Sequence, residues 1–322
     1  MKLFKAHKFL SGVLALSLGL GLISSNAYAD SQNAPLPLEG YELDVGVSPA
    51  PPFVMIDSHF QDLGGIDVDI IRELQRRTGF KLKNNRFHIM GFGDLLDLAA
   101  KGKMDISGAG ISLSAKREKI FTQSPATFRS HAVVVVPTSS TIKGRSDLPG
   151  KTLAAENGTD ATDLVSEDMA ALIDIKHEAT TFMTFYSVAA GHSDALITEA
   201  PMAQEVVDDW ARGKLKIAYH IPDSDNDMGL MFKKDTAASK VLYDTFVQMR
   251  EDGTIQKIVH NYLPNYEFPD DLLPTSVRLA KQKQKQAKEQ EAMKLAHTDL
   301  NSQNIIEPEG VTTVTNTQIN SY

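Results

Sequence analysis

The sequence predicts an α/β fold with two lobes. Segments with strand-like and helix-like patterns alternate from Tyr41 to Tyr266, and such a βαβα order implies parallel strands that are covered by helices. Removing a predicted 29-residue leader from the 322-residue chain leaves 293 residues, a length that favours two lobes over one. A second α/β set follows the long apolar run from His131 to Pro137, so each lobe is expected to contain one set.

The first 29 residues have the pattern of a secretory signal peptide. Lys2, Lys5 and Lys8 precede an apolar run over residues 9–23, and an A-Y-A sequence ending at Ala29 supplies the small residues that a signal peptidase needs. The apolar run is shorter than the ~20 residues of a membrane span, and no stop-transfer charges follow it. We therefore expect export and cleavage after Ala29.

Cysteine content and charge exclude several classes of protein. The chain has no cysteine, which excludes a disulfide framework, thiol chemistry and a lipid anchor behind the leader. Without the three leader lysines, 30 of the 33 basic residues remain against 41 acidic ones, a net charge of about −11. This acidic balance argues against nucleic acid as a partner.

The first α/β set begins with a strand over residues 41–47, behind which the PAPPF sequence at 49–53 excludes both helix and central strand. Apolar residues at three-residue spacing over 68–74 predict a helix that Gly79 ends. Three further elements are expected, namely a strand over 81–87, a helix over 93–102 and a strand over 104–108.

The second set repeats this order. Its expected elements are strands over 131–137, 151–156 and 193–199, with the start of a helix at 157–165. In each set a helix end, a glycine and a strand opened by an aspartate follow one another, with Asp105 in the first set and Asp194 in the second. Gly110 and Glu199 stand five residues beyond these aspartates. Ligands of open α/β sheets bind beyond the carboxyl ends of strands, so both residues are expected to face a cleft between the lobes.

Residues 267–322 differ from the rest in composition. The stretch 281–296 is polar on nearly every face and has no apolar stripe to bury. We expect a polar tail that is helical and then disordered. A charged arm that binds a partner is the alternative.

The sequence G110-I-S-L-S-A-K-R117 places a glycine, two serines and an arginine within eight residues. Guanidinium presents a rigid fork of donors, and hydroxyl and amide donors can fill the remaining lone pairs, so this combination suits a carboxylate. The alternative is an ordinary strand-to-helix turn in which Ser114 caps a helix and Arg117 is solvated. These eight residues alone leave both interpretations open.

Several short motifs stand in one order between Val45 and Leu263. They include V45-G-V, G65-I-D-V-D69, G93-D-L-L-D-L-A-A-K-G-K-M-D105, S112-L-S-A-K-R117, E156-N-G-T159, D194-A-L-I-T-E199 and D252-G-T-I-Q-K-I-V-H-N-Y-L263. In these motifs the chain resembles family 3 of the bacterial extracellular solute-binding proteins, the periplasmic receptors for polar amino acids. The motifs cover roughly three quarters of the chain behind the leader.

The resemblance implies a periplasmic-binding-protein type II fold, in which two strand crossovers form a hinge and the lobes close over one ligand. The crossovers are expected near residues 131–137 and 225–232. Lobe 1 then comprises residues 38–132 and 227–266, and lobe 2 comprises residues 133–226. A helix over 241–253 is expected to pack back onto lobe 1.

The resemblance also implies site residues. Arg117 matches the arginine that binds the ligand α-carboxylate, and Gly110 and Ser112 match residues that hold the ligand through backbone and hydroxyl groups. Glu199 stands where relatives usually have aspartate and would pair with the α-ammonium group. Phe92 matches the aromatic residue that stacks on the ligand. The plainer alternatives are that Phe92 belongs to the core and that Glu199 caps a helix.

Thr159 and Asp160 complete the expected ligand-binding set. They lie in a loop that should open a helix, whose free amides suit a carboxylate. Asp160 stands where the family prefers a small or hydroxylated residue. It could merely complement the helix terminus, or together with Glu199 it could make lobe 2 acidic and favour a cationic ligand side chain such as lysine or arginine. An aromatic residue that many relatives have in the 48–52 loop is missing.

Other functional patterns are rejected. Residues 223–234 begin like a calcium loop, but Met228 replaces the glycine and Lys234 the bidentate glutamate that such a loop needs. The nine histidines show no metal-ligand spacing, and G-x-S-x-G is absent. We therefore expect no metal, no cofactor and no catalytic residue.

The expected function is a periplasmic, monomeric receptor that captures a polar amino acid and delivers it to the permease of an inner-membrane ABC transporter. Two alternatives stay open. One is an enzyme on the same scaffold that resembles cyclohexadienyl dehydratases, with Glu199 as acid or base. The other is a sensory protein that reports ligand through its tail.

Overall fold

The computed structural model describes residues 35–303, apart from 58–61, 161–163 and 165–170. The chain divides into two units, one ending at Leu273 and one starting at Pro274. The predicted signal peptide over 1–29 and its cleavage site lie outside the described residues, as does the tail beyond residue 303.

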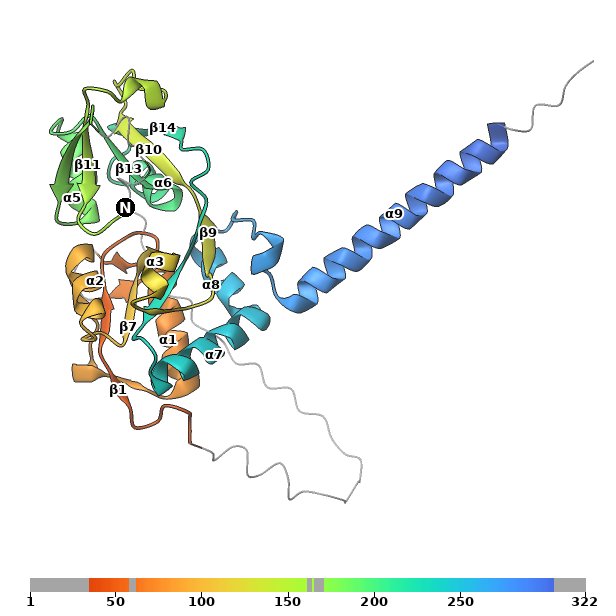
Figure 1. The fold of residues 1–322 in the computed structure, drawn as a ribbon, viewed down its shortest axis with the longest axis horizontal. Coiled ribbons are helices and arrows are strands. Elements are labelled where there is room, and N and C mark those ends of the chain that lie inside the picture. Colours follow the sequence, from red (N-terminus) through yellow and green to blue (C-terminus); the bar gives the residue numbers. More distant parts are fainter. Residues whose placement is uncertain (1–34, 58–61, 161–163, 165–170, 304–322) are drawn as a thin grey trace, which may run out of the picture. The chain divides into compact units, whose positions relative to one another are not determined.

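The first unit contains two mixed sheets, which Figure 1 shows one above the other. The sheet that we assign to lobe 1 has the order β6-β2-β7-β15-β8, with β9 also paired to β15. Its strands are β2 (Val45–Val47), β6 (His88–Ile89), β7 (Ile106–Ser112), β8 (Thr122–Gln123), β9 (Phe128–Ser130) and β15 (Asn226–Phe232). β2 runs parallel to β6 and β7, whereas β15 is antiparallel to its partners.

The other sheet, which we assign to lobe 2, has the order β12-β11-β13-β10-β14. Its strands are β10 (Ala132–Pro137), β11 (Thr152–Glu156), β12 (Asp174–Glu178), β13 (Ala195–Glu199) and β14 (Leu215–His220). β11 is parallel to β12 and β13, and β10 is antiparallel to β13 and β14. Small ladders join β1 (Glu42–Leu43) to β5 (Lys81–Leu82) and β3 (Met55–Ile56) to β4 (Leu63–Gly64). The predicted α/β class with parallel strand pairs is confirmed.

Two segments cross between the sheets. β9 of the first sheet continues through His131 into β10 of the second, and β14 continues through residues 221–225 into β15 of the first. The register between β9 and β15 pairs Ser130 with Asn226, so the crossings lie against each other. They lie at the starts of the expected ranges 131–137 and 225–232, whose remaining residues form β10 and β15 within the two sheets.

The aspartates Asp105 and Asp194, which open corresponding strands in the two sets, make the same backbone contacts in both lobes. The N–H of Asp105 donates to Asp44 O (2.7 Å), and its carboxylate accepts from Asp44 N (2.8 Å). In lobe 2 the N–H of Asp194 donates to Thr152 O (2.8 Å), and its carboxylate accepts from Thr152 N (2.9 Å). Each aspartate thus joins the start of its own strand, β7 or β13, to the neighbouring strand and fixes the register between the two.

Helices cover both sheets. In lobe 1 these are α1 (Ile66–Thr78), α2 (Phe92–Ala100), the short α3 (Ala115–Glu118), α7 (Ala237–Glu251) and α8 (Thr254–Tyr262). In lobe 2 they are α5 (Thr181–Ala189) and α6 (Ala200–Asp208). α1 ends where expected, because Gly79 takes the left-handed conformation (φ 82°) that closes a helix.

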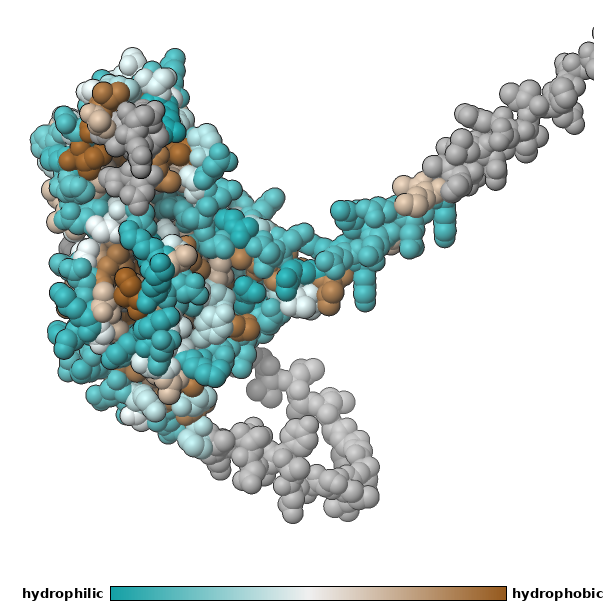
Figure 2. Space-filling view, viewed as in Figure 1, coloured by the Kyte–Doolittle hydropathy of each residue, from teal (hydrophilic) through white to brown (hydrophobic). Residues whose placement is uncertain are grey.

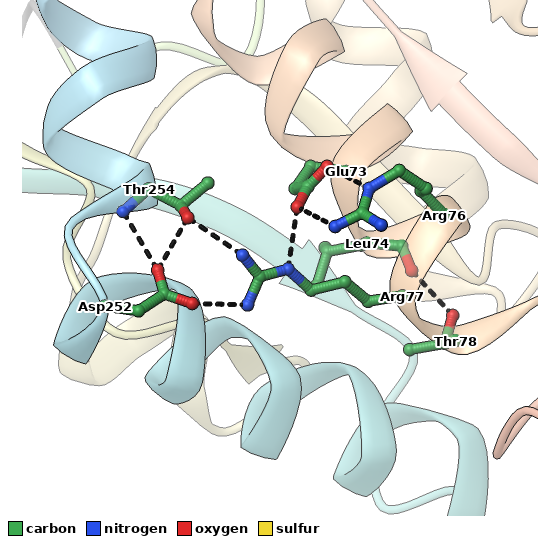
Figure 3. A network of polar contacts seen from close by, with 7 residues as sticks. All are labelled: Glu73, Leu74, Arg76, Arg77, Thr78, Asp252 and Thr254. Atoms are coloured by element: carbon green, nitrogen blue, oxygen red, sulfur yellow. Dashed lines mark hydrogen bonds and ion pairs between the residues drawn. The ribbon is translucent and has the colours of Figure 1, made fainter. Parts of the chain in front are cut away.

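The C-terminal helices of the first unit return to lobe 1. Leu242, Phe246 and Met249 of α7 are fully buried in one core with the apolar face of α1. Figure 3 shows Arg77 of α1 between two acceptors at the α7–α8 turn, with 2.6 Å to Asp252 Oδ2 and 2.8 Å to Thr254 Oγ1. Segments about 175 residues apart in sequence are thus joined by apolar burial and by an ion pair.

One expected strand is wrong. Only Lys81–Leu82 of the predicted strand over 81–87 is extended, and a 3-10 turn follows at Lys83–Asn85. Asn84 and Asn85 both take positive φ, at 55° and 54°, which breaks the strand. The strand that pairs with β2 in the lobe 1 sheet is β6, which starts soon after this turn.

The second unit contains α9 (Thr275–Gln303), a helix of 29 residues. Figure 2 shows hydrophilic side chains over most of its coloured length. One of its polar pairs joins Lys285 and Glu289 at 4.0 Å on successive turns. Among the helices of the described ranges, none combines the length and the apolar character that crossing a membrane demands.

Candidate ligand-binding site

A cavity of about 300 Å³ lies between the two lobes, within the size range of small-molecule sites. It is lined by the carboxyl ends of β7 and β13, by the start of α2 and by the second crossing. All seven residues expected at the site line it, namely Phe92, Gly110, Ser112, Arg117, Thr159, Asp160 and Glu199.

Arg117 is held at the edge of this cavity by lobe 1. Its side chain is only 8% exposed, and its Nη1 donates to Ser112 O at 2.9 Å. Ser114 caps the short helix α3 by accepting from the backbone N–H of Arg117 (3.2 Å). The turn therefore has the predicted cap, but Arg117 is buried and not solvated. Burial lowers the pKa of Arg117, and the nearby Asp160 opposes that shift.

Gly110 is required by close packing. It has φ +61°, and a Cβ there would lie 2.5 Å from the ring of Phe53. Its N–H donates to the buried carboxylate of Asp67 at 2.8 Å. Burial raises the pKa of Asp67 to about 7, although the N–H groups of Gly110 and Ala109 oppose the shift. Asp67 thus fixes the strand end that carries Gly110 and Ser112.

Phe92 lies both in the core and at the cavity, and its stacking on a ligand stays a prediction. It is 7% exposed in the core cluster between α2 and β7, and its ring also lines the cavity. The guanidinium carbon of Arg117 lies 5.9 Å from the ring centroid, within range of a cation–π contact.

Lobe 2 reaches Arg117 through Asp160. Oδ2 of Asp160 lies 3.1 Å from Arg117 Nη2, and the Asp160 side chain is 42% exposed. Thr159 precedes it, with both its N–H and its hydroxyl directed to Glu156 O. Most of the helix expected behind this loop lies outside the described residues.

Glu199 ends β13 and precedes α6, but its side chain makes no capping hydrogen bond. Its Oε1 accepts from Asn226 Nδ2 at 3.0 Å. The other oxygen, Oε2, is buried without a hydrogen-bond partner, and so is Oδ1 of Asn226. A buried acceptor without a donor is costly, so this pair is suited to receive N–H groups of a ligand.

Glu156 is a site residue that the sequence did not single out. Its Oε2 accepts from Thr181 Oγ1 at 2.8 Å, whereas Oε1 is buried without a partner. Burial raises the pKa of Glu156 to about 7, although Thr181 opposes the shift. The motif E156-N-G-T159 contained it, but only the fold brings its side chain to the cavity.

The electrostatic balance of the cavity is acidic. Among the described residues that line it, Arg117 is the only cation, and the carboxylates are those of Glu156, Asp160, Glu199, Asp223 and Asp225. The arrangement can hold one carboxylate at Arg117 and several N–H donors at the opposite acceptors. Such a donor and acceptor pattern matches a zwitterion that carries additional positive charge.

This chain is similar in sequence to known solute-binding and amino-acid-binding proteins. The family model described as "Bacterial extracellular solute-binding proteins, family 3" matches residues 43–265. The amino-acid-binding protein AabA of Dichelobacter nodosus is 23% identical over 222 residues, which cover 66% of this chain and 86% of that protein. The L-cystine-binding protein TcyK of Bacillus subtilis (strain 168) is 26% identical over 209 residues, which cover 63% and 76%.

Solved structures agree in fold. An ancestral arginine-binding protein bound to arginine superposes with a TM-score of 0.62 at 25% identity, and the match covers 69% of this chain and 97% of that one. The expected fold of a two-lobed type II binding protein is confirmed by such matches. The named ligands of these relatives differ, and at this identity they do not determine which amino acid fits this cavity.

Proposed function

Because the chain belongs to family 3 of the bacterial extracellular solute-binding proteins, we propose that it is the periplasmic receptor of an ABC transporter and captures a polar amino acid between its lobes. The signal-peptide pattern at 1–29 supports export with cleavage after Ala29. The protein acts as a monomer without covalent chemistry, and its closed form delivers the ligand to an inner-membrane permease.

The observation that carries this proposal is that one buried cation and several unpaired acceptors line the same cavity. Arg117 is buried and lies in lobe 1, where it would bind the α-carboxylate. Glu199 Oε2, at the end of β13, and Asn226 Oδ1, at the start of β15, lack donors and would accept from the α-ammonium group. An amino-acid backbone supplies both partners at once.

We further propose a ligand with a cationic side chain. Asp160 and Glu156 add acceptors that a neutral side chain would leave unmatched, and the Glu156 Oε1 atom has no donor of its own. Asp160 already pairs with Arg117, so a ligand carboxylate must share or replace it. A cationic side chain favours the exchange because it offers Asp160 and Glu156 a new partner.

Calorimetric titration of the purified protein with arginine, lysine, glutamine, glutamate and cystine tests the proposal. We expect arginine or lysine to bind more tightly than glutamate by at least about tenfold, equivalent to 1.4 kcal/mol. Tightest binding of glutamate would contradict the cationic class alone. Binding of no amino acid would contradict the receptor itself. In a separate turnover assay, consumption of prephenate, a substrate of cyclohexadienyl dehydratases, would favour the enzyme alternative.

A further inference from the structure

Two histidines and an aspartate meet where the crossings leave lobe 2. His131 lies between β9 and β10, His220 ends β14, and Asp225 immediately precedes β15. One ligand-capable atom from each of the three lies within 4.8 Å of the other two. The two imidazole rings face each other with centroids 4.1 Å apart and an angle of 33° between their planes.

These three side chains have no other polar partner among the described residues. Two other histidines have: His88 lies 3.4 Å from Asp44, and a ring nitrogen of His260 lies 2.9 Å from Tyr266 O. His131 is half-buried, whereas His220 and Asp225 are exposed and accessible to an ion. The lone pairs of the cluster are therefore available.

The backbone around the cluster is fixed. Ser224 Oγ accepts from Ala132 N (2.9 Å) and donates to Ile221 O (2.6 Å). Ile221 N in turn donates to Ala132 O at 2.9 Å. These bonds tie the loop before Asp225 to the residue after His131, so the donors are brought together by the main chain before any ion binds. Preorganisation of this kind reduces the ordering cost of binding.

We propose that His131, His220 and Asp225 bind one divalent transition-metal ion, with Zn²⁺ as the best match. Two imidazole nitrogens and one carboxylate oxygen are typical zinc donors at 2.0 to 2.2 Å, whereas Ca²⁺ and Mg²⁺ prefer all-oxygen sites. Separations up to 4.8 Å exceed those around a bound zinc by up to about 1.5 Å, so the exposed His220 and Asp225 side chains must move inward. Three protein ligands leave one position for water.

The location gives the ion a second effect. His131 belongs to one crossing, Asp225 to the other, and Asp225 also lines the ligand cavity. An ion held by both crossings would restrict their relative movement, so zinc and the amino acid would change each other's affinity by the same factor. This coupling rests on the proposed function, whereas the metal site itself does not.

Calorimetric titration of the EDTA-treated protein with Zn²⁺ tests the site. We expect one ion per chain, and with Co²⁺ the visible absorption of a histidine-ligated ion. His220→Ala and Asp225→Asn should each weaken zinc binding by at least about tenfold, since even the loss of outer partners costs 10- to 100-fold. His177→Ala, at an exposed histidine of β12, should bind zinc like the original protein.

As a control for folding, the melting temperature of each variant is measured without metal. His220→Ala and Asp225→Asn should melt at the same temperature as the original protein, because both side chains are exposed. Zinc binding that survives both substitutions would refute the site, and so would an equal loss in His177→Ala. The zinc titration needs no amino acid, so its failure is distinguishable from failure of the proposed receptor function.

Discussion

Arg117→Ala removes the only cation among the described residues that line the cavity. Truncating one partner of a buried charge pair costs about 2 to 5 kcal/mol, because the other charge stays buried and unpaired. Since 1.4 kcal/mol corresponds to a tenfold change, the dissociation constant of the amino acid should increase by a factor between about 30 and a few thousand. The Arg117 side chain is 8% exposed, so water can replace the guanidinium only in part.

The effect on folding should be smaller. Ser112 O loses a charged donor at 2.9 Å, a change worth about 1.5 to 3 kcal/mol. The ion pair with the 42%-exposed Asp160 adds little, because solvent screens it.

Calorimetric titration with the amino acid that the original protein binds measures the affinity change, and thermal melting measures the stability change. Arg76→Ala is the matched control, since Arg76 is an exposed arginine on α1 whose partner is Glu73. Both properties should remain near the original values in that variant. If Arg117→Ala bound the ligand within threefold of the original affinity while still folded, the carboxylate could not lie at Arg117.

Three further substitutions probe the same region. Asp160→Asn removes a carboxylate that would partner a cationic ligand side chain, so the ratio of arginine to glutamine affinity should fall by up to about fivefold. An unchanged ratio in calorimetry would exclude Asp160 from selectivity. Glu199→Gln keeps the shape but loses the charge opposite the ammonium group, so affinity should drop at least about tenfold, and retained affinity would move that group elsewhere. Asp67→Asn should flatten the pH dependence of stability. Burial raises the Asp67 pKa from 3.8 to about 7, so its contribution is fully present below about pH 4 and is lost as pH rises to about 7. The free energy of unfolding in urea should fall between pH 5 and pH 8 by about 2 to 3 kcal/mol more in the original protein than in the variant. An equal change in both proteins would contradict the raised pKa of Asp67.

The local pattern together with the family resemblance predicted the lobe 1 residues that line the cavity. Gly110, Ser112 and Arg117 lie on one strand, turn and helix, so eight consecutive residues determine how they are placed. Glu199 could be found because its strand repeats the arrangement that places Gly110.

Contacts between distant segments could not be found in this way. The hydrogen bond between Asn226 and Glu199 joins residues 27 positions apart, and the raised pKa of Glu156 arises from burial that only the assembled lobes provide. The cluster of His131, His220 and Asp225 shows no metal-ligand spacing in the sequence, because His131 precedes β10 whereas His220 ends the distant β14. The predicted strand over 81–87 failed because two asparagines took left-handed conformations that an apolar pattern does not report.

The tight turn at Gly110 has a consequence for how this protein could diverge. A side chain at that position would collide with Phe53, so the part of the cavity where we propose that the ligand carboxylate binds cannot be altered there by a single substitution. Asp160 is partly exposed on the opposite lobe and can be exchanged without disturbing a core. New ligand preferences should therefore arise by mutation of lobe 2, while lobe 1 keeps the proposed contacts to the α-carboxylate that all amino acids share.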